Sequence, residues 1–256
     1  MKRLIALIGL IACFTCMQAQ KVKHPSLLYT PERIQMAKQR VANDSRYAEY
    51  WQQIREAADS KLQKRSLNDA DYLSLAYLMT GEKKYSDKIR EILLDVIKAD
   101  TWGSTEMLAR IPVWTADLGL AHKAYLSAIA YDAVYNELST TERKEIARGL
   151  KRLALDPCLG DWVLEPTRIH SLNSMGHNWW TSCACMGGIL ALSLQNELPE
   201  AVEGARVLNE VLPEWFSFAG DVLQQKPKSF DEAGGMYESL NYANFGIQEA
   251  LQFRLA

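Results

Sequence analysis

Residues 175–188, which read MGHNWWTSCACMGG, bring together side-chain types that could support a metal centre, an activated thiol or a platform for a sugar ring. Cys183 and Cys185 are two positions apart and would lie on different sides of a helix, which is poor geometry for a shared metal ion. No cationic neighbour is present to activate either thiol. We therefore interpret both cysteines as core residues, and the chemistry of this stretch rests on His177, Asn178 and the two tryptophans that follow.

A second stretch of the same character lies at residues 229–246, which read SFDEAGGMYESLNYANFG. Like the segment EPTRIHSLNSMGHNWW at 165–180, it is a polar, glycine-bearing loop that leads into a helical pattern. The chain is also rich in aromatic residues, with 7 Trp and 11 Tyr. Such rings grip flat, partly polar ligands, so both stretches are candidates for ligand binding.

Helical patterns account for almost all of the sequence after the first twenty residues. Thr30 is a favourable N-cap before Pro31, Gly81 is a C-cap signal, and Ser139 with Glu142 forms a capping box. No convincing alternating strand pattern and no glycine-rich phosphate loop is present. The sequence thus predicts an all-α protein, with helices over 45–64, 69–81, 83–99, 117–136 and 139–155.

A loose repeat organises these helices. An apolar helix rich in small residues is followed by a polar turn and an amphipathic helix, as in SAIAYDAVYNELSTTERKEIARGL at 127–150. This alternation predicts inner helices buried on most sides and outer helices with one wet face, which would build an (α/α) toroid or, alternatively, a solenoid. The sequence stops within a helical pattern, so we expect residues 24–256 to be the N-terminal part of an incomplete toroid.

The first residues predict export. Lys2 and Arg3 precede an apolar run, and small and polar residues follow near Ala19, so residues 1–19 read as a signal peptide. Alternatively, Cys13 in LIAC would become the lipidated first residue of an outer-membrane lipoprotein. We expect a periplasmic or secreted protein without a membrane span, and the net charge of −2 offers no basic surface for nucleic acid.

Five sequence elements, in order, resemble a known family. They are YTPERI at 29–34, LAYLMTGEKKY at 75–85, AIAYDAVYNELSTTER at 128–143, the Asn-Trp pair that leads into a glycine-containing helix, and FDEAGGMYESLNY at 230–242. Together they are similar to the N-terminal helical region of heparinase II/III-type polysaccharide lyases. This resemblance implies a toroid lyase domain that cleaves an acidic, uronic-acid polysaccharide by β-elimination, with no metal or other cofactor required.

The resemblance also implies roles for individual residues. Asn178 would neutralise the substrate carboxylate, and His177 beside it would assist as a neutralising group or base. Tyr242 matches the tyrosine of the family's E-x-x-x-Y pattern and would act as acid or base. Because positions i and i+4 share a helix face, we expect Glu238 to orient the Tyr242 hydroxyl.

Substrate binding is expected from residues around these groups. Trp179 or Trp180 would stack on a sugar ring, Arg168 would hold a second carboxylate, and His170 is a spare candidate. Structural interpretations remain open for each: Asn178 could cap the following helix, and a tryptophan or Tyr242 could belong to the core.

Two other functions fit the same sequence. An α/α-barrel glycoside hydrolase would need two carboxylates across a cleft, which Asp231, Glu232 and Glu238 could supply. A surface lipoprotein that binds glycans without catalysis would need only the aromatic platforms. The sequence leaves open the particular glycan, the oligomeric state and whether this chain is active alone.

Overall fold

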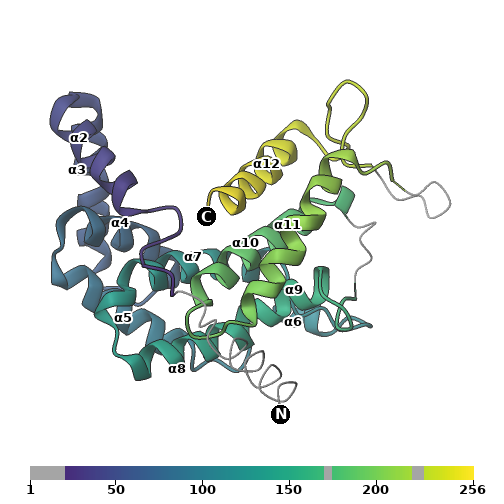
Figure 1. Cartoon of the computed structure of the whole chain (residues 1–256), viewed down its shortest axis with the longest axis horizontal. Helices are drawn as coiled ribbons and strands as arrows, with labels where there is room; N and C mark the ends of the chain where they lie inside the picture. Colours follow the sequence, from purple (N-terminus) through teal and green to yellow (C-terminus); the bar gives the residue numbers. More distant parts are fainter. Residues whose placement is uncertain (1–20, 170–174, 221–227) are drawn as a thin grey trace, which may run out of the picture.

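Helices dominate the computed structural model, which describes residues 21–169, 175–220 and 228–256 (Figure 1). Within these residues there is no strand, only an isolated antiparallel bridge between Phe230 and Met236. The all-α fold class is therefore confirmed. The helices are α2 (Pro31–Asn43), α3 (Ser45–Lys61), η1 (Leu67–Asp69), α4 (Ala70–Thr80), α5 (Lys83–Val96), α6 (Thr105–Leu108), α7 (Leu118–Val134), η2 (Tyr135–Glu137), α8 (Thr140–Leu150), the π-helical turn η3 (Lys151–Leu155), α9 (Asp156–Trp162), α10 (Asn178–Leu194), α11 (Ala201–Ser217) and α12 (Leu240–Leu255).

Several helix boundaries follow from the local signals in the sequence. The Thr30 side chain accepts a hydrogen bond from the Arg33 amide and opens α2. Ser139 and Glu142 form the predicted capping box of α8. Gly81 ends α4 with a φ of 71°, a left-handed conformation that glycine adopts without steric cost.

The inner helices form a row in which α4 packs against α7, α7 against α10, and α10 against α12. The residues of α7 and α10 are small or apolar on nearly every side, so both helices can be buried almost completely. By contrast, α5, α8 and α11 are amphipathic and keep one face in solvent. The predicted alternation of inner and outer helices is present, whereas closure into a toroid stays a prediction.

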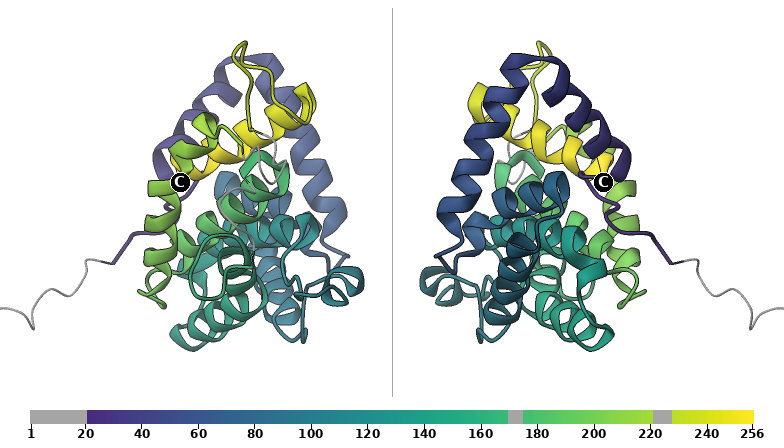
Figure 2. Two further views of the ribbon diagram at one scale, coloured as in Figure 1. Left: turned by 90° about the vertical axis from the view of Figure 1, so that its right-hand side faces the viewer. Right: turned by 90° about the vertical axis from the view of Figure 1, so that its left-hand side faces the viewer.

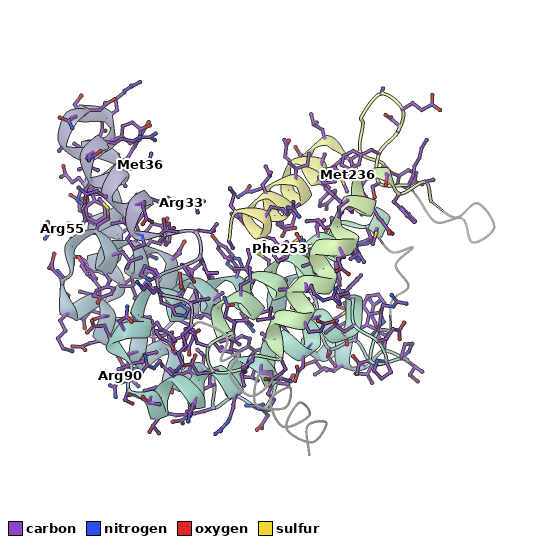
Figure 3. All side chains as sticks on the ribbon, viewed as in Figure 1. Arg33, Met36, Arg55, Arg90, Met236 and Phe253 are labelled. Atoms are coloured by element: carbon purple, nitrogen blue, oxygen red, sulfur yellow. The ribbon has the colours of Figure 1, made fainter. Side chains whose placement is uncertain are left out.

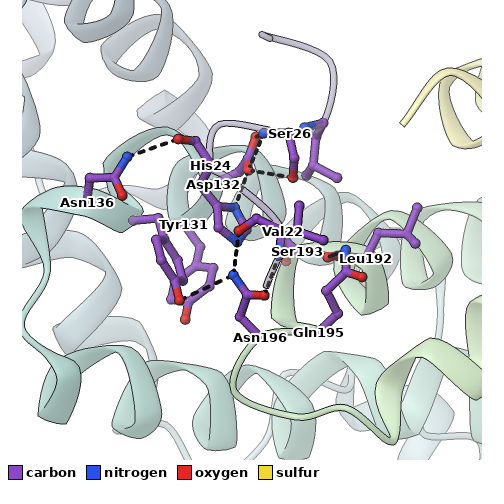
Figure 4. Close-up of polar contacts among 12 residues, drawn as sticks. Val22, His24, Ser26, Tyr131, Asp132, Asn136, Leu192, Ser193, Gln195 and Asn196 are labelled. Carbon is purple, nitrogen blue, oxygen red and sulfur yellow. Dashed lines mark hydrogen bonds and ion pairs between the residues drawn. The ribbon is translucent and has the colours of Figure 1, made fainter. Parts of the chain in front are cut away.

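The segment before α2 is bound to the inner helices by a buried polar network (Figure 4). The Asp132 carboxylate of α7 accepts hydrogen bonds from the Ser26 and Leu27 amides at 2.9 and 3.0 Å, and it lies 2.6 Å from Nδ1 of His24. The side chain of Asn196, just after α10, exchanges two hydrogen bonds with the backbone of Val22. This network joins the beginning of the described chain to α7 and to the turn between α10 and α11.

The two ends of the described chain also approach each other. In Figures 1 and 2, α2, α3 and α12 rise above the layer that contains α7 and α10. The guanidinium of Arg33, on α2, donates to the Leu255 carbonyl at the end of α12 at 3.4 Å. Phe253, labelled with Arg33 in Figure 3, is buried beside Gly188 of α10.

Residues 21–169, 175–220 and 228–256 contain no helix with the length and apolar character needed to cross a bilayer.

Candidate functional site

The two loop segments singled out in the sequence meet at the start of α10. The Glu238 carboxylate, which lies just before α12, accepts a hydrogen bond from the backbone N–H of Asn178 at 2.8 Å. It also accepts from Nδ2 of the Asn178 side chain, at 3.1 Å to Oε1 and 2.9 Å to Oε2. A carboxylate at the first turn of a helix also interacts favourably with the helix dipole. Residues sixty positions apart in the chain are thereby held in direct contact.

The Asn178 side chain is directed toward Glu238 and away from solvent. Asn178 is only 5% exposed, and its Oδ1 is buried with no hydrogen-bond partner among the described residues. Its backbone carbonyl accepts from the Thr181 hydroxyl at 2.8 Å. The residue that caps α10 is His177, so Asn178 occupies the first position of the helix and is not its cap.

His177 is the polar side chain of this group that reaches solvent. Its Nδ1 accepts a hydrogen bond from the Trp179 amide at 3.1 Å, which fixes the ring over the helix N-terminus. In the neutral imidazole the other nitrogen, Nε2, then carries the proton. That nitrogen lies 3.9 Å from Oε1 of Glu238, and the side chain is 52% exposed. His177 can therefore donate to a ligand beside Glu238.

Tyr242 lies in the first turn of α12 but does not share a helix face with Glu238. Ser239 caps α12, accepting from the Tyr242 amide at 3.3 Å, so the helix begins at Leu240 and Glu238 precedes it. The expected i,i+4 relation between Glu238 and Tyr242 is wrong for this reason. Tyr242 is 46% exposed, and no hydrogen bond within the described ranges engages its hydroxyl.

The rings of His177, Trp179 and Trp114 contact one another in sequence and form an aromatic wall at the start of α10. The Trp179 ring is half-buried, and its centroid lies 5.8 Å from that of His177 and 6.2 Å from that of Trp114. The guanidinium carbon of Arg110 lies 4.4 Å from the Trp114 ring centroid. Trp114 and Arg110 are not among the site residues predicted from the sequence, although both belong to the polar and aromatic segment DTWGSTEMLARIPVW at 100–114.

The remaining sequence candidates divide among different environments. Trp180 is fully buried in the core, so the expected stacking of its ring on a sugar is excluded in this conformation. The Arg168 guanidinium forms an ion pair with Glu165 at 2.6 Å and is largely covered. His170 lies outside the described residues. Burial raises the pKa of both Cys183 and Cys185, as expected for core residues without an activating cation.

A buried acid lies deeper along the contact between α10 and α12. Glu249 is 7% exposed, and its Oε2 accepts from the Ser182 hydroxyl at 3.0 Å. Burial is the main cause that raises the pKa of Glu249 to about 7, although hydrogen bonds from Ser182 and Thr181 oppose this effect. Glu249 is not among the residues predicted from the sequence, although it is the single carboxylate in the largely apolar segment NFGIQEALQF at 244–253.

A second polar region borders the segment that follows Trp114. A cavity of about 600 Å³ is bordered by the π-helical turn, α9 and the start of α11. Within it, Asp161 accepts from the Thr115 and Ala116 amides at 2.7 and 3.0 Å, while burial raises the pKa of Asp161. The described part of the chain contains no cluster of His, Cys, Asp or Glu side chains suited to a metal ion.

No family model matches the chain, and no curated protein matches it significantly.

Proposed function

We propose that this chain is part of a polysaccharide lyase with an (α/α) toroid fold, which cleaves a uronic-acid glycan by β-elimination. The chain would supply His177 and Tyr242 to the catalytic site. The observation that carries the proposal is the contact of Glu238 with both the backbone and the side chain of Asn178. It brings the start of α10, with His177, to the start of α12, with Tyr242. The two exposed side chains that can exchange protons are thus presented from neighbouring helix ends.

The elimination needs three groups. A base removes the proton at C5, the electrons of the C5–H bond form the C4=C5 double bond, and the bond between C4 and the glycosidic oxygen breaks. An acid protonates the departing oxygen, and a donor stabilises the charge that develops on the carboxylate. In this proposal Tyr242 serves as both base and acid: its phenolate removes the C5 proton, and the resulting phenol protonates the departing glycosidic oxygen. His177 donates from Nε2 to the carboxylate. Asn178, whose amide already binds Glu238, positions the two segments.

The substrate and location belong to the same proposal. An acidic polysaccharide fits an exposed imidazole and an aromatic wall that ends at Arg110. Such a polymer is found outside the cytoplasm, in agreement with the signal peptide expected at residues 1–19.

Glycan binding without catalysis is the alternative that a specific observation favours. The Asn178 amide is buried and bound to Glu238, so it does not face a substrate in this conformation. A glycoside hydrolase has less support, because two of its three candidate carboxylates are already engaged. Glu238 binds Asn178, and Oδ1 of Asp231 accepts from the Ala233 and Gly235 amides of its own loop.

The proposal is tested by incubating the protein with alginate, chondroitin and heparan polysaccharides and recording the ultraviolet absorbance of the conjugated double bond. We expect absorbance to rise with one of them and Tyr242→Phe to abolish the rise. Tyr47→Phe, which alters an exposed tyrosine on α3, is the matched control and should leave the rate unchanged. New reducing ends without absorbance would indicate a hydrolase, and binding without either product would indicate the non-catalytic alternative.

A further inference from the structure

The aromatic wall ends in a cation held over a ring. The centroids of His177 and Trp179 are 5.8 Å apart, and those of Trp179 and Trp114 are 6.2 Å apart. Arg110 then lies over the Trp114 ring at 4.4 Å. The four side chains come from the start of α10 and from the segment between α6 and α7. Consecutive contacts therefore join His177 to Arg110 through the two tryptophan rings.

The chemistry of this surface suits one kind of ligand. A half-buried indole offers an apolar face for a pyranose ring, and Trp179 is half-buried. The Trp114 ring, in contrast, is engaged by Arg110 and by Trp162, whose ring centroid lies 6.4 Å from that of Trp114. A guanidinium presents paired N–H donors that match a carboxylate, and stacking on an indole restricts its orientation. A ring carrying a carboxylate, such as a uronic acid, satisfies both requirements at once.

The present partner of Arg110 is easily displaced. Arg110 donates to Glu106 at 3.4 Å, across one turn, and both side chains are well exposed. Exposed pairs of this kind contribute little free energy, because water and salt screen the attraction. A ligand carboxylate with better geometry can therefore replace Glu106 at small cost.

We propose that Arg110 and Trp114 form a binding subsite for a second uronic-acid residue, next to the residue that reacts beside His177. This inference rests on the proposed function for the identity of the polymer. The sugar ring packs on the exposed part of the Trp179 ring, and its carboxylate binds the Arg110 guanidinium, which lies over the neighbouring Trp114 ring. The subsite selects polymers that carry a carboxylate on the residue beside the cleaved bond.

The test measures binding by calorimetry in the Tyr242→Phe background, so that turnover does not consume the ligand. The probes are tetrasaccharides of alginate, chondroitin and heparan, and the same compounds with their carboxylates reduced to alcohols. We expect Arg110→Gln to weaken binding of the best acidic tetrasaccharide about tenfold and to leave the reduced form unchanged. Glu106→Gln should strengthen acidic binding about twofold, because it removes the competing carboxylate.

Arg40→Gln is the matched control. Arg40 also lies over an aromatic ring, that of Tyr47 at 5.5 Å, but on the α2–α3 face of the molecule. It should leave binding unchanged. The proposal is overturned if Arg110→Gln binds the acidic probe as the parent does, if it weakens acidic and reduced probes equally, or if the parent binds none of the three acidic probes.

The outcome separates this inference from the proposed function. Normal double-bond formation with no effect of Arg110→Gln on binding or on KM would leave the lyase proposal standing and remove the subsite. Carboxylate-dependent binding that Arg110→Gln weakens, without any double-bond product from the protein that retains Tyr242, would establish the subsite on a glycan-binding protein and remove the lyase proposal.

Discussion

The pH dependence of stability should report directly on the buried carboxyl of Glu249. Burial raises the pKa of Glu249 from its ordinary value of 4.5 to about 7, and Ser182 supplies a neutral hydroxyl partner. None of the ion pairs among the described residues includes Glu249. The folded state therefore favours the protonated carboxyl. At neutral pH the folded protein must either keep the Glu249 carboxyl protonated or hold its negative charge in a buried position.

The sign and size follow from linkage. Below pH 4.5 the carboxyl is protonated in both states, so the stability of the native protein is fully present there. As the pH rises from 4.5 through about 7, the unfolded state loses its proton first and stability falls. A pKa of about 7 in place of 4.5 corresponds to a loss of about 3 kcal/mol in the free energy of unfolding by pH 8. Glu249→Gln keeps the size and a hydrogen-bonding oxygen but removes this loss.

The assay is urea unfolding of the native protein and Glu249→Gln, followed by tryptophan fluorescence from pH 5 to pH 8. The free energy of unfolding of the variant, relative to that of the native protein, should increase as the pH rises and should reach about 3 kcal/mol at the upper end of this range. Glu214→Gln, which changes an exposed carboxylate on α11, should show a constant difference from the native protein. A constant difference for Glu249→Gln as well would refute the reasoning, since the buried carboxyl would then not bind a proton preferentially in the folded state.

Three further outcomes are expected from the packing. Asp132→Ala should lower the free energy of unfolding by about 3 kcal/mol, because the buried amides before α2 lose their acceptor; urea unfolding and faster proteolysis of the N-terminal segment would show it, and unchanged values would contradict it. Gly188→Ala should cost about 1–3 kcal/mol, because a Cβ there would lie 2.6 Å from the Phe253 ring; an unchanged melting temperature would show that the ring moves aside freely. Cys183 and Cys185 should react with a thiol reagent only after urea unfolding, because burial raises the pKa of both thiols; rapid labelling of the native protein would contradict their placement in the core.

Local signals in the sequence were sufficient to predict the positions of most of the helices. Thr30 and Ser139 accept backbone hydrogen bonds at the expected helix starts, and Gly81 adopts the left-handed conformation at the expected end. The burial of α7 and α10 was also predictable, because their residues are apolar or small around the whole helix. These features depend on residues within one or two turns of each other, which a sequence pattern records.

The partners of the site residues depend on long-range packing and were harder to predict. Trp179 and Trp180 are adjacent in the sequence, yet one is half-buried at the surface and the other lies in the core, because neighbours in a helix point about 100° apart. Nothing in the local sequence identifies Trp114 as the ring beside Trp179. The position of Glu249 against Ser182 likewise follows from the packing of α12 on α10.

For Glu238 the local sequence pattern and the fold indicate different partners. A double-mutant cycle can determine which partner is coupled to this carboxylate. The E-x-x-x-Y spacing favours coupling of Glu238 with Tyr242, whereas the structure joins Glu238 to Asn178 and starts α12 after Glu238. If Glu238 acts through its contact with Asn178, Glu238→Ala and Asn178→Ala should be coupled by about 1–2 kcal/mol in the free energy of unfolding. Either substitution alone removes the hydrogen bonds between the two side chains, so the double variant loses no more of them than each single variant does. Glu238→Ala combined with Tyr242→Phe should be additive. Strong coupling with Tyr242 and none with Asn178 would mean that the helical spacing, and not the contact between the two segments, determines how this carboxylate is used.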